Sequence, residues 1–263
     1  MTRGRLFYII IAVSLLVPIL MTVMLTMMDG QESVDQQTGQ TVIMQGPDSV
    51  WESFGTLPSG GTEGMSPNIE VKQENADGAE MGGGMDVMAL CNINMAFMGV
   101  AVFVCLFISD DFRSGFSKNL FTVRAGKGSY VISKTVVGFA VGAAMLIAYF
   151  IGAMLGGAIC SLSFALPEGV TVISIIFCML AKILLMAVFV SIFVLISVSA
   201  RSRAWLGICG SLGGGMLLFM MVSMITPLNA GAIHVLLCLA GGAMFAVGLG
   251  AASRLVLNKV SLV

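Results

Sequence analysis

The residue types that catalysis requires are scarce in this chain, and those present stand apart from one another. The one histidine, His234, argues against a Ser-His relay and leaves an HExxH zinc site without its second histidine. The stretch 124–129 looks superficially like a phosphate-binding loop, but Phe121 stands where the leading glycine belongs and Lys127 is followed by glycine. The sequence therefore predicts no catalytic centre and no ATP site in this chain, and we expect His234 to be an interfacial or helix-packing residue.

Methionine and cysteine are the remaining candidate metal ligands. The chain has 21 methionines, and Met81, Met85 and Met88 cluster in a way that would suit Cu(I), which prefers soft thioether ligands. The other methionines scatter through all the apolar stretches, as packing and lipid-facing positions do, so we expect no metal site. The 6 cysteines all lie in apolar stretches and act as small hydrophobic residues, and a bridge between Cys91 and Cys160 is the one pairing left open.

Lys182 is the one ionisable residue deep inside a long apolar stretch. Counting from Val170 at 1.5 Å per residue places it about 18 Å from the end of that stretch. An unpaired ammonium at such a depth costs on the order of 3 kcal/mol or more. Because no carboxylate of the chain is expected at a similar depth, the ammonium must snorkel, meet backbone carbonyls, face water or meet another chain. A role in a polar pathway and a structural role both remain open.

The composition shows which elements position these residues. With 57% hydrophobic and 10% charged residues and a mean hydropathy of +0.99, the chain carries too much apolar surface for a water-soluble fold of this size. Its apolar residues fall into stretches long enough to cross about 30 Å of hydrocarbon at 1.5 Å per residue. These predicted spans are 6–28, 87–109, 131–161, 170–199, 204–226 and 231–256. The first is longer than a signal-peptide core and lacks a cleavage pattern, so we expect it to stay attached.

The basic residues near the ends of these spans all fall on one side. They are Arg3, Arg5, Arg113, Lys118, Arg124, Lys127, Lys134, Arg201, Arg203, Arg254 and Lys259. The positive-inside rule assigns this side, with both termini, to the cytoplasm. The opposite side receives the acidic segment 29–86, in which Lys72 is the single basic residue. Its composition indicates a mobile or partly structured outer loop: a solvated linker, a gate, or a recognition surface for a cationic substrate.

Small residues recur inside the spans at helical spacing, as at Gly138 and Gly142 and again at Gly152 and Gly156. In lipid, small residues let helix backbones approach closely, so that dispersion replaces the missing hydrophobic drive. We therefore expect tight packing within the membrane, or a face for a second subunit.

The most specific pattern lies in the segment from Ser109 to Lys134: an acidic pair, a basic and turn-rich stretch, and then a lysine that opens the third span. The candidate residues in it are Asp110, Asp111, Arg113, Gly115, Lys118, Asn119, Arg124, Lys127 and Lys134. Attraction to the membrane surface would explain the basic residues but not their order. This order resembles the ABC-2 family of transporter permeases, in which an acidic residue at the end of the second span leads into a basic, glycine-containing stretch and a lysine at the third span. The layout of six spans with a long first outer loop is similar too.

The resemblance implies an all-α membrane protein with six transmembrane helices, both termini cytoplasmic, in the ABC-2 (type V exporter-like) architecture. It implies a permease subunit in a bacterial cytoplasmic membrane, surrounded by lipid, which pairs with a second copy or a sister permease. Separate ABC ATPase subunits would bind ATP and Mg²⁺ and dock on the coupling segment 110–130, through charges at Arg113, Lys118 and Lys127. Asp110 or Asp111 would hold the bend at the end of the second span.

The family resemblance also suggests the cargo: a peptide, a bacteriocin or a drug-like molecule that leaves the cell, with no nucleic acid partner. A cationic peptide would suit the acidic outer loop. Two features depart from the family pattern: an aspartate pair stands where glutamate is usual, and the residues before the first span are too few for an interface helix. The alternative is a membrane scaffold or channel component that is not coupled to ATP. An intramembrane enzyme fits less well, because the spans lack acid-base residues.

Overall fold

The computed structural model describes residues 2–29, 32–34, 41–43, 47–53, 92–116, 127–167, 169–200 and 203–259. The helices of this part of the chain are α1 (Thr2–Met27), α3 (Met95–Arg113), α5 (Lys127–Ile159), α6 (Val172–Ala200), α7 (Ala204–Ile225) and α8 (Ala232–Lys259). Between α1 and α3 lie two short antiparallel strands, β1 (Glu32–Val34) and β2 (Thr41–Ile43), and one turn of 3-10 helix, η1 (Val50–Ser53).

The helices have the length and composition of membrane spans. Five of them are long and apolar enough to cross a bilayer: Phe7–Met27, Met95–Arg113, Gly128–Ile159, Val172–Ala200 and Ala232–Leu257. The predicted all-α membrane fold is thereby confirmed for the described residues. α7 has 22 residues, and its apolar stretch Ala204–Phe219 is shorter than the other five, so the sixth span and the ABC-2 architecture stay predictions.

Several helices have boundaries that differ from the predicted spans: α1 begins at Thr2 instead of 6, α8 ends at Lys259 instead of 256, and the differences in α3 and α5 affect the coupling segment. The span predicted at 87–109 is a helix that begins at Met95, after a turn at 92–94, and continues to Arg113. The span predicted at 131–161 begins earlier, at Lys127. Hydropathy marks where the hydrocarbon ends, whereas a helix continues as long as its backbone hydrogen bonds and side-chain partners allow. Both described ends of the coupling segment 110–130 are therefore helical.

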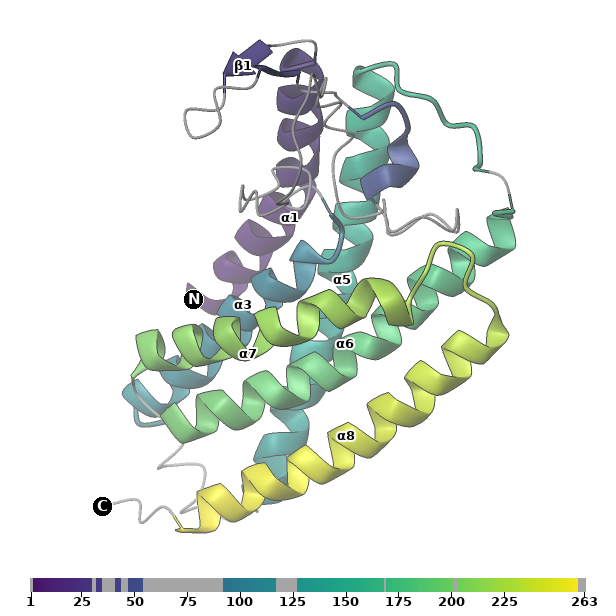
Figure 1. Cartoon of the computed structure of the whole chain (residues 1–263). Coiled ribbons are helices and arrows are strands. Elements are labelled where there is room, and N and C mark those ends of the chain that lie inside the picture. Colours follow the sequence, from purple (N-terminus) through teal and green to yellow (C-terminus); the bar gives the residue numbers. More distant parts are fainter. Residues whose placement is uncertain are drawn as a thin grey trace, which may run out of the picture.

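α6 lies between α7 and α8 and also packs against α3 and α5 (Figure 1). Its centre is aromatic: the ring of Phe189 lies 4.6 Å from that of Phe97 on α3 and 5.9 Å from that of Phe193 on α6, measured between ring centroids. Met186 and all three rings are buried. We call Phe97, Phe189 and Phe193 the aromatic cluster; it is the buried centre of the bundle formed by α3, α6 and α7.

Contacts between helix termini show which termini lie together at each of the two ends of the bundle. At one end, the residues that precede α3 and follow α7 meet α6. At the other, the last turn of α3 meets the first turns of α5, and the side chain of Arg254 on α8 lies beside Gly128. We call these the outer end and the cytoplasmic end, after the predicted sides. The exposed Arg113, Arg203 and Arg254 all belong to the cytoplasmic end.

α1 packs on the outer half of α5 through glycine. A Cβ atom on Gly152 would lie 2.3 Å from the carbonyl oxygen of Leu15 and 2.6 Å from Cγ of Pro18, and one on Gly156 would lie 3.2 Å from Cα of Ile19. Only residues without a side chain allow backbones to approach so closely. The opposite face of α1 exposes large apolar side chains, namely Tyr8, Ile9, Val13, Leu16, Leu20, Met24 and Met27.

Part of the acidic outer segment is attached to the outer end of α5. The backbone N–H of Val50 donates to the carbonyl of Ser163 over 3.2 Å, and the indole N–H of Trp51 donates to that of Phe164 over 3.3 Å. Val50 also packs against Gly157, and both Val50 and Trp51 are buried. The predicted outer loop 29–86 is thus structured around η1, while its residues 54–86 lie outside the described residues.

The close approach of α1 to α5 predicts the effect of filling it. We expect Gly152→Val to destabilise the protein by about 1–3 kcal/mol, the usual cost of overpacking, because the new methyl groups meet the backbone of α1. Gly241→Val on α8 is the matched control, since a Cβ atom there meets nothing within 4 Å. The measurement is thermal unfolding of the purified protein in a single detergent. Equal melting temperatures for the two variants would show that this packing does not stabilise the fold.

Candidate functional site

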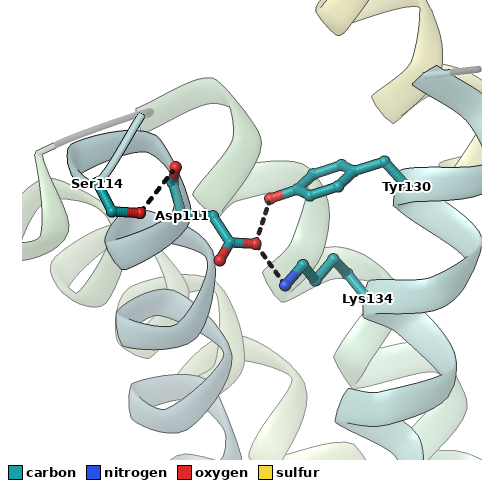
Figure 2. A network of polar contacts seen from close by, with 4 residues as sticks. All are labelled: Asp111, Ser114, Tyr130 and Lys134. Atoms are coloured by element: carbon teal, nitrogen blue, oxygen red, sulfur yellow. Dashed lines mark hydrogen bonds and ion pairs between the residues drawn. The ribbon is translucent and has the colours of Figure 1, made fainter. Parts of the chain in front are cut away.

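The buried carboxylate of Asp111 joins the last turn of α3 to the first turns of α5. Its Oδ2 atom forms an ion pair with the ammonium of Lys134 and accepts a hydrogen bond from the hydroxyl of Tyr130 over 3.2 Å (Figure 2). Asp111 and Lys134 are both buried. Removing one partner of a buried ion pair strongly destabilises a protein, because it takes away the opposite charge that compensates the other partner.

Aromatic rings enclose this ion pair. The ammonium of Lys134 lies 3.6 Å from the ring centroid of Phe107 and 5.4 Å from that of Tyr130. The ring of Phe112 meets Tyr130 edge-on, with centroids 6.4 Å apart. Cation–π attraction is stronger at desolvated sites, so the rings stabilise the ammonium as well as shield it. We call Phe107, Asp111, Tyr130 and Lys134 the clasp.

The chain turns sharply just beyond the clasp. The N–H of Ser114 donates to the carbonyl of Asp110 over 2.9 Å and closes α3, and the Ser114 hydroxyl lies 3.5 Å from the carbonyl oxygen of Asp111 (Figure 2). Gly115 follows with φ of +71°, a conformation that residues with a side chain seldom adopt. No described residue comes within 4 Å of the position of a Cβ atom on Gly115, so among these residues it is the backbone conformation that requires glycine here.

The structure brings some of the predicted coupling residues together and leaves others apart. Asp111 and Lys134, which the sequence placed at opposite ends of the motif, form one contact. The side chains of Asp110 and Arg113 lie on the exposed side of the last turn of α3. Lys127 is the first residue of α5. The remaining members, Lys118, Asn119 and Arg124, lie outside the described residues.

Tyr130 and Phe107 belong to the clasp but were not among the predicted site residues. Both precede a charged residue of the clasp by four positions on the same helix: Phe107 precedes Asp111, and Tyr130 precedes Lys134. Residues four apart lie on the same face of a helix. That spacing, an aromatic residue one turn before each charge, is the signal by which they could have been found.

Lys182 is fully buried and held by side chains of its own chain. Its ammonium donates to Oδ1 of Asn94 over 2.7 Å and to Oγ1 of Thr226 over 3.0 Å. Asn94 immediately precedes α3, and Thr226 immediately follows α7. The sequence analysis did not expect these partners: neutral side chains at helix ends serve here as acceptors, as carboxylates or carbonyls would. We call Lys182, Asn94 and Thr226 the outer contact.

A second polar contact joins the same three helices nearer the cytoplasmic end. The Sγ atom of Cys105 on α3 lies 3.0 Å from the hydroxyl of Ser197 on α6 and 3.1 Å from that of Ser211 on α7. Ser197 also donates to the carbonyl of Phe193 in its own helix over 2.6 Å. These small side chains fasten helices whose backbones continue through the contact, and we call them the inner contact.

Some of the candidate metal ligands and cysteines lie within the described residues. Among the described residues, no three His, Cys, Asp or Glu side chains gather as a metal site, and the five cysteines there are free thiols. Cys91 and the methionine cluster at 81–88 lie outside the described residues. Nδ1 of His234 accepts the N–H of Gly231 over 3.2 Å, a local contact at the start of α8, and the interfacial or helix-packing role of His234 stays a prediction.

The fold and these buried polar contacts define a multi-pass helical membrane protein. Comparison of the chain with protein-family models, with curated proteins and with solved structures gives no match. Its function must therefore be argued from the geometry of its own residues.

The clasp predicts a graded response to substitution. We expect Tyr130→Phe to cost about 1 kcal/mol, as a lost hydrogen bond does, and Lys134→Met to cost about 3–5 kcal/mol because it takes the ammonium away from the buried carboxylate of Asp111. The double variant Asp111→Leu, Lys134→Met should recover most of that loss. Thermal unfolding in one detergent ranks the variants, and the exposed Arg113→Gln is the control. If Lys134→Met and Arg113→Gln had the same melting temperature, the ion pair would not hold the two helices together.

Proposed function

We propose that this chain is the membrane-spanning permease subunit of an ATP-binding-cassette exporter, driven by separate ATPase subunits that bind ATP and Mg²⁺. The clasp is the observation that carries the proposal. It joins α3 to α5, the two membrane helices that run into the segment 110–130 from either end. A partner that displaces a segment held in this way displaces α3 and α5 with it, as rigid bodies.

The surface beside the clasp suits a docking partner. Arg113 is exposed at the end of α3, and no described residue lies within 4 Å of the place where a Cβ atom on Gly115 would stand. A protein surface that carries acidic residues can therefore approach the backbone of the bend while it meets the guanidinium of Arg113. In this proposal Arg113, Lys118 and Lys127 are the docking charges, and the clasp passes the movement to the spans.

The rest of the assembly follows from the same proposal. A second copy or a sister permease completes the pathway across the cytoplasmic membrane of a bacterium. The cargo is a peptide, a bacteriocin or a drug-like molecule that is exported, and the acidic segment 29–86 favours a cationic peptide. A membrane scaffold or channel component without ATP coupling is the competing function.

The proposed orientation has a direct test. A cysteine in place of Ser59 should react with an impermeant maleimide in intact cells, because 29–86 is placed outside. A cysteine in place of Ser117 should react only after the membrane is permeabilised, because 110–130 is placed inside. Labelling is read after purification from a chain whose native cysteines are replaced. The reverse pattern would refute the orientation and the coupling role together.

The proposed coupling role is tested by reversing one charge. Arg113→Glu should weaken association with the ATPase subunit about tenfold, the effect typical of an interface charge pair, and added salt should weaken wild-type association as well. Arg203→Glu is the matched control, since Arg203 is exposed at the same end of the bundle but lies outside the segment. The measurement is titration of the reconstituted permease with a candidate ATPase subunit, chosen from neighbouring reading frames by its Walker A motif. Association that is equal in Arg113→Glu and wild type would favour the scaffold.

The bend is tested separately at Gly115. Gly115→Val forces a β-branched side chain into a left-handed conformation and should uncouple ATP hydrolysis from transport while membrane insertion stays normal. Gly115→Asn is the matched control, because asparagine adopts this conformation more readily. ATPase activity and cargo uptake are measured in the same vesicles. Full coupling in Gly115→Val would show that the bend has no part in transmission, and uncoupling in both variants would point to close approach by the partner instead.

A further inference from the structure

The outer contact is a single point at which three distant segments meet. Lys182 lies about 15 Å along α6 from Val172, at 1.5 Å per residue. Its ammonium reaches the turn that leads into α3 through Asn94 and the turn that follows α7 through Thr226. One side chain thus holds the outer termini of two helices against the side of a third.

The outer contact lies on the covered face of α6. Toward the outer end of α6, Val172, Ile173 and Ile176 are all largely exposed. On another face Ile175, Cys178 and Lys182 are buried, and the aromatic cluster lies further inward. The outer contact is therefore a buried polar layer between the outer end of α6 and the aromatic cluster.

The two polar contacts between α3, α6 and α7 differ in what they fasten. The inner contact joins positions where all three helices continue on both sides. The outer contact joins places where two of the helices stop, at the turns 92–94 and 226–230. Backbone torsion at such turns absorbs movement more readily than a continuous helix does. Non-helical backbone at membrane depth is tolerated where protein buries it or where it lines a water-filled cavity.

The chemistry of the outer contact allows it to open. Both oxygens that accept from Lys182 are uncharged, so the ammonium is held less strongly than it would be by a carboxylate. Thr226 donates its own hydroxyl proton to the carbonyl of Val222 over 2.7 Å, so it keeps a partner when Lys182 leaves. Water can replace both oxygens as partners of the ammonium.

We propose that Lys182 is the latch of an outer gate. While it holds Asn94 and Thr226, the outer ends of α3 and α7 stay on α6 and close the bundle above the aromatic cluster. When the two hydrogen bonds break, the turns 92–94 and 226–230 swing away from α6 and water enters from the outer side as far as the cluster. The latch rests on the proposed function only for its use in export, since opening is a property of this chain.

Cys178 supplies a native reporter for the latch. It is buried one turn outward of Lys182, and its thiol donates to the carbonyl of Thr226 over 3.5 Å. We would measure the rate at which a charged methanethiosulfonate reagent modifies Cys178, by peptide mass spectrometry, in the purified chain in lipid nanodiscs without any ATPase. In the wild-type chain the reaction should be slow, because the closed latch covers the thiol.

Two variants and a matched control decide the outcome. Thr226→Val keeps the shape of the side chain and removes the acceptor of Lys182 together with the hydroxyl's own bond to Val222. Modification of Cys178 should be about tenfold faster, as expected for the lost bond to Lys182. Lys182→Met should accelerate it further. Ser191→Ala is the control, because this buried hydroxyl donates only within α6, to the carbonyl of Ala187 over 2.7 Å. Its rate should match the wild-type rate.

The isosteric Thr226→Val keeps the test decisive if Lys182→Met does not fold. Faster modification in Thr226→Val than in Ser191→Ala, at equal melting temperature, supports the latch. Equal rates in Thr226→Val and wild type overturn it, and so does acceleration in Ser191→Ala of the same size, which would indicate general loosening of α6. Because no ATPase is present, the latch stands or falls independently of the titration that tests the proposed function.

Discussion

The low dielectric of the membrane interior is the main constraint on this structure. A charge or an unpaired helix end that is buried there finds no water to bind, so its partners must come from the protein. Asp111 and Lys134 satisfy that constraint with each other, in a pocket lined by the rings of Phe107 and Tyr130. Lys182 satisfies it with two neutral oxygens. The ion pair of Asp111 and Lys134 fixes how α3 meets α5. The hydrogen bonds of Lys182 hold the start of α3 and the end of α7.

The packing between helices follows from the same solvent. Lipid is as apolar as the helix surfaces, so burying one helix on another gains little from the hydrophobic effect. Each pair of carbon atoms in contact contributes only about 0.1–0.2 kcal/mol of dispersion, so stable packing needs many contacts at short range. Gly152 provides them for α1, where the carbonyl of Leu15 comes to within 2.3 Å of the position a Cβ atom would occupy. The aromatic cluster provides them for α3 and α6.

Hydropathy alone predicted the helices, because a chain in lipid must form them wherever it is apolar for long enough. It placed the start of α3 at 87 instead of Met95 and that of α5 at 131 instead of Lys127, since hydropathy follows the hydrocarbon and not the backbone hydrogen bonds. Asp111 and Lys134 were both candidates, but their pairing depends on how α3 and α5 cross. The partners of Lys182 lie 88 and 44 residues away, at helix ends that no local pattern specifies.

α3 takes part in both charged contacts and so relates the two ends of the bundle. Asn94, which precedes its first residue, belongs to the outer contact, and Asp111 in its last turn belongs to the clasp. Its 19 residues make a rod about 28 Å long. The clasp is an ion pair, and the outer contact is a set of hydrogen bonds to neutral oxygens, so a force applied to α3 breaks the outer contact first. In the proposed exporter, a push on the coupling segment would therefore move α3 and α5 together at the cytoplasmic end and release Asn94 from Lys182 at the outer end.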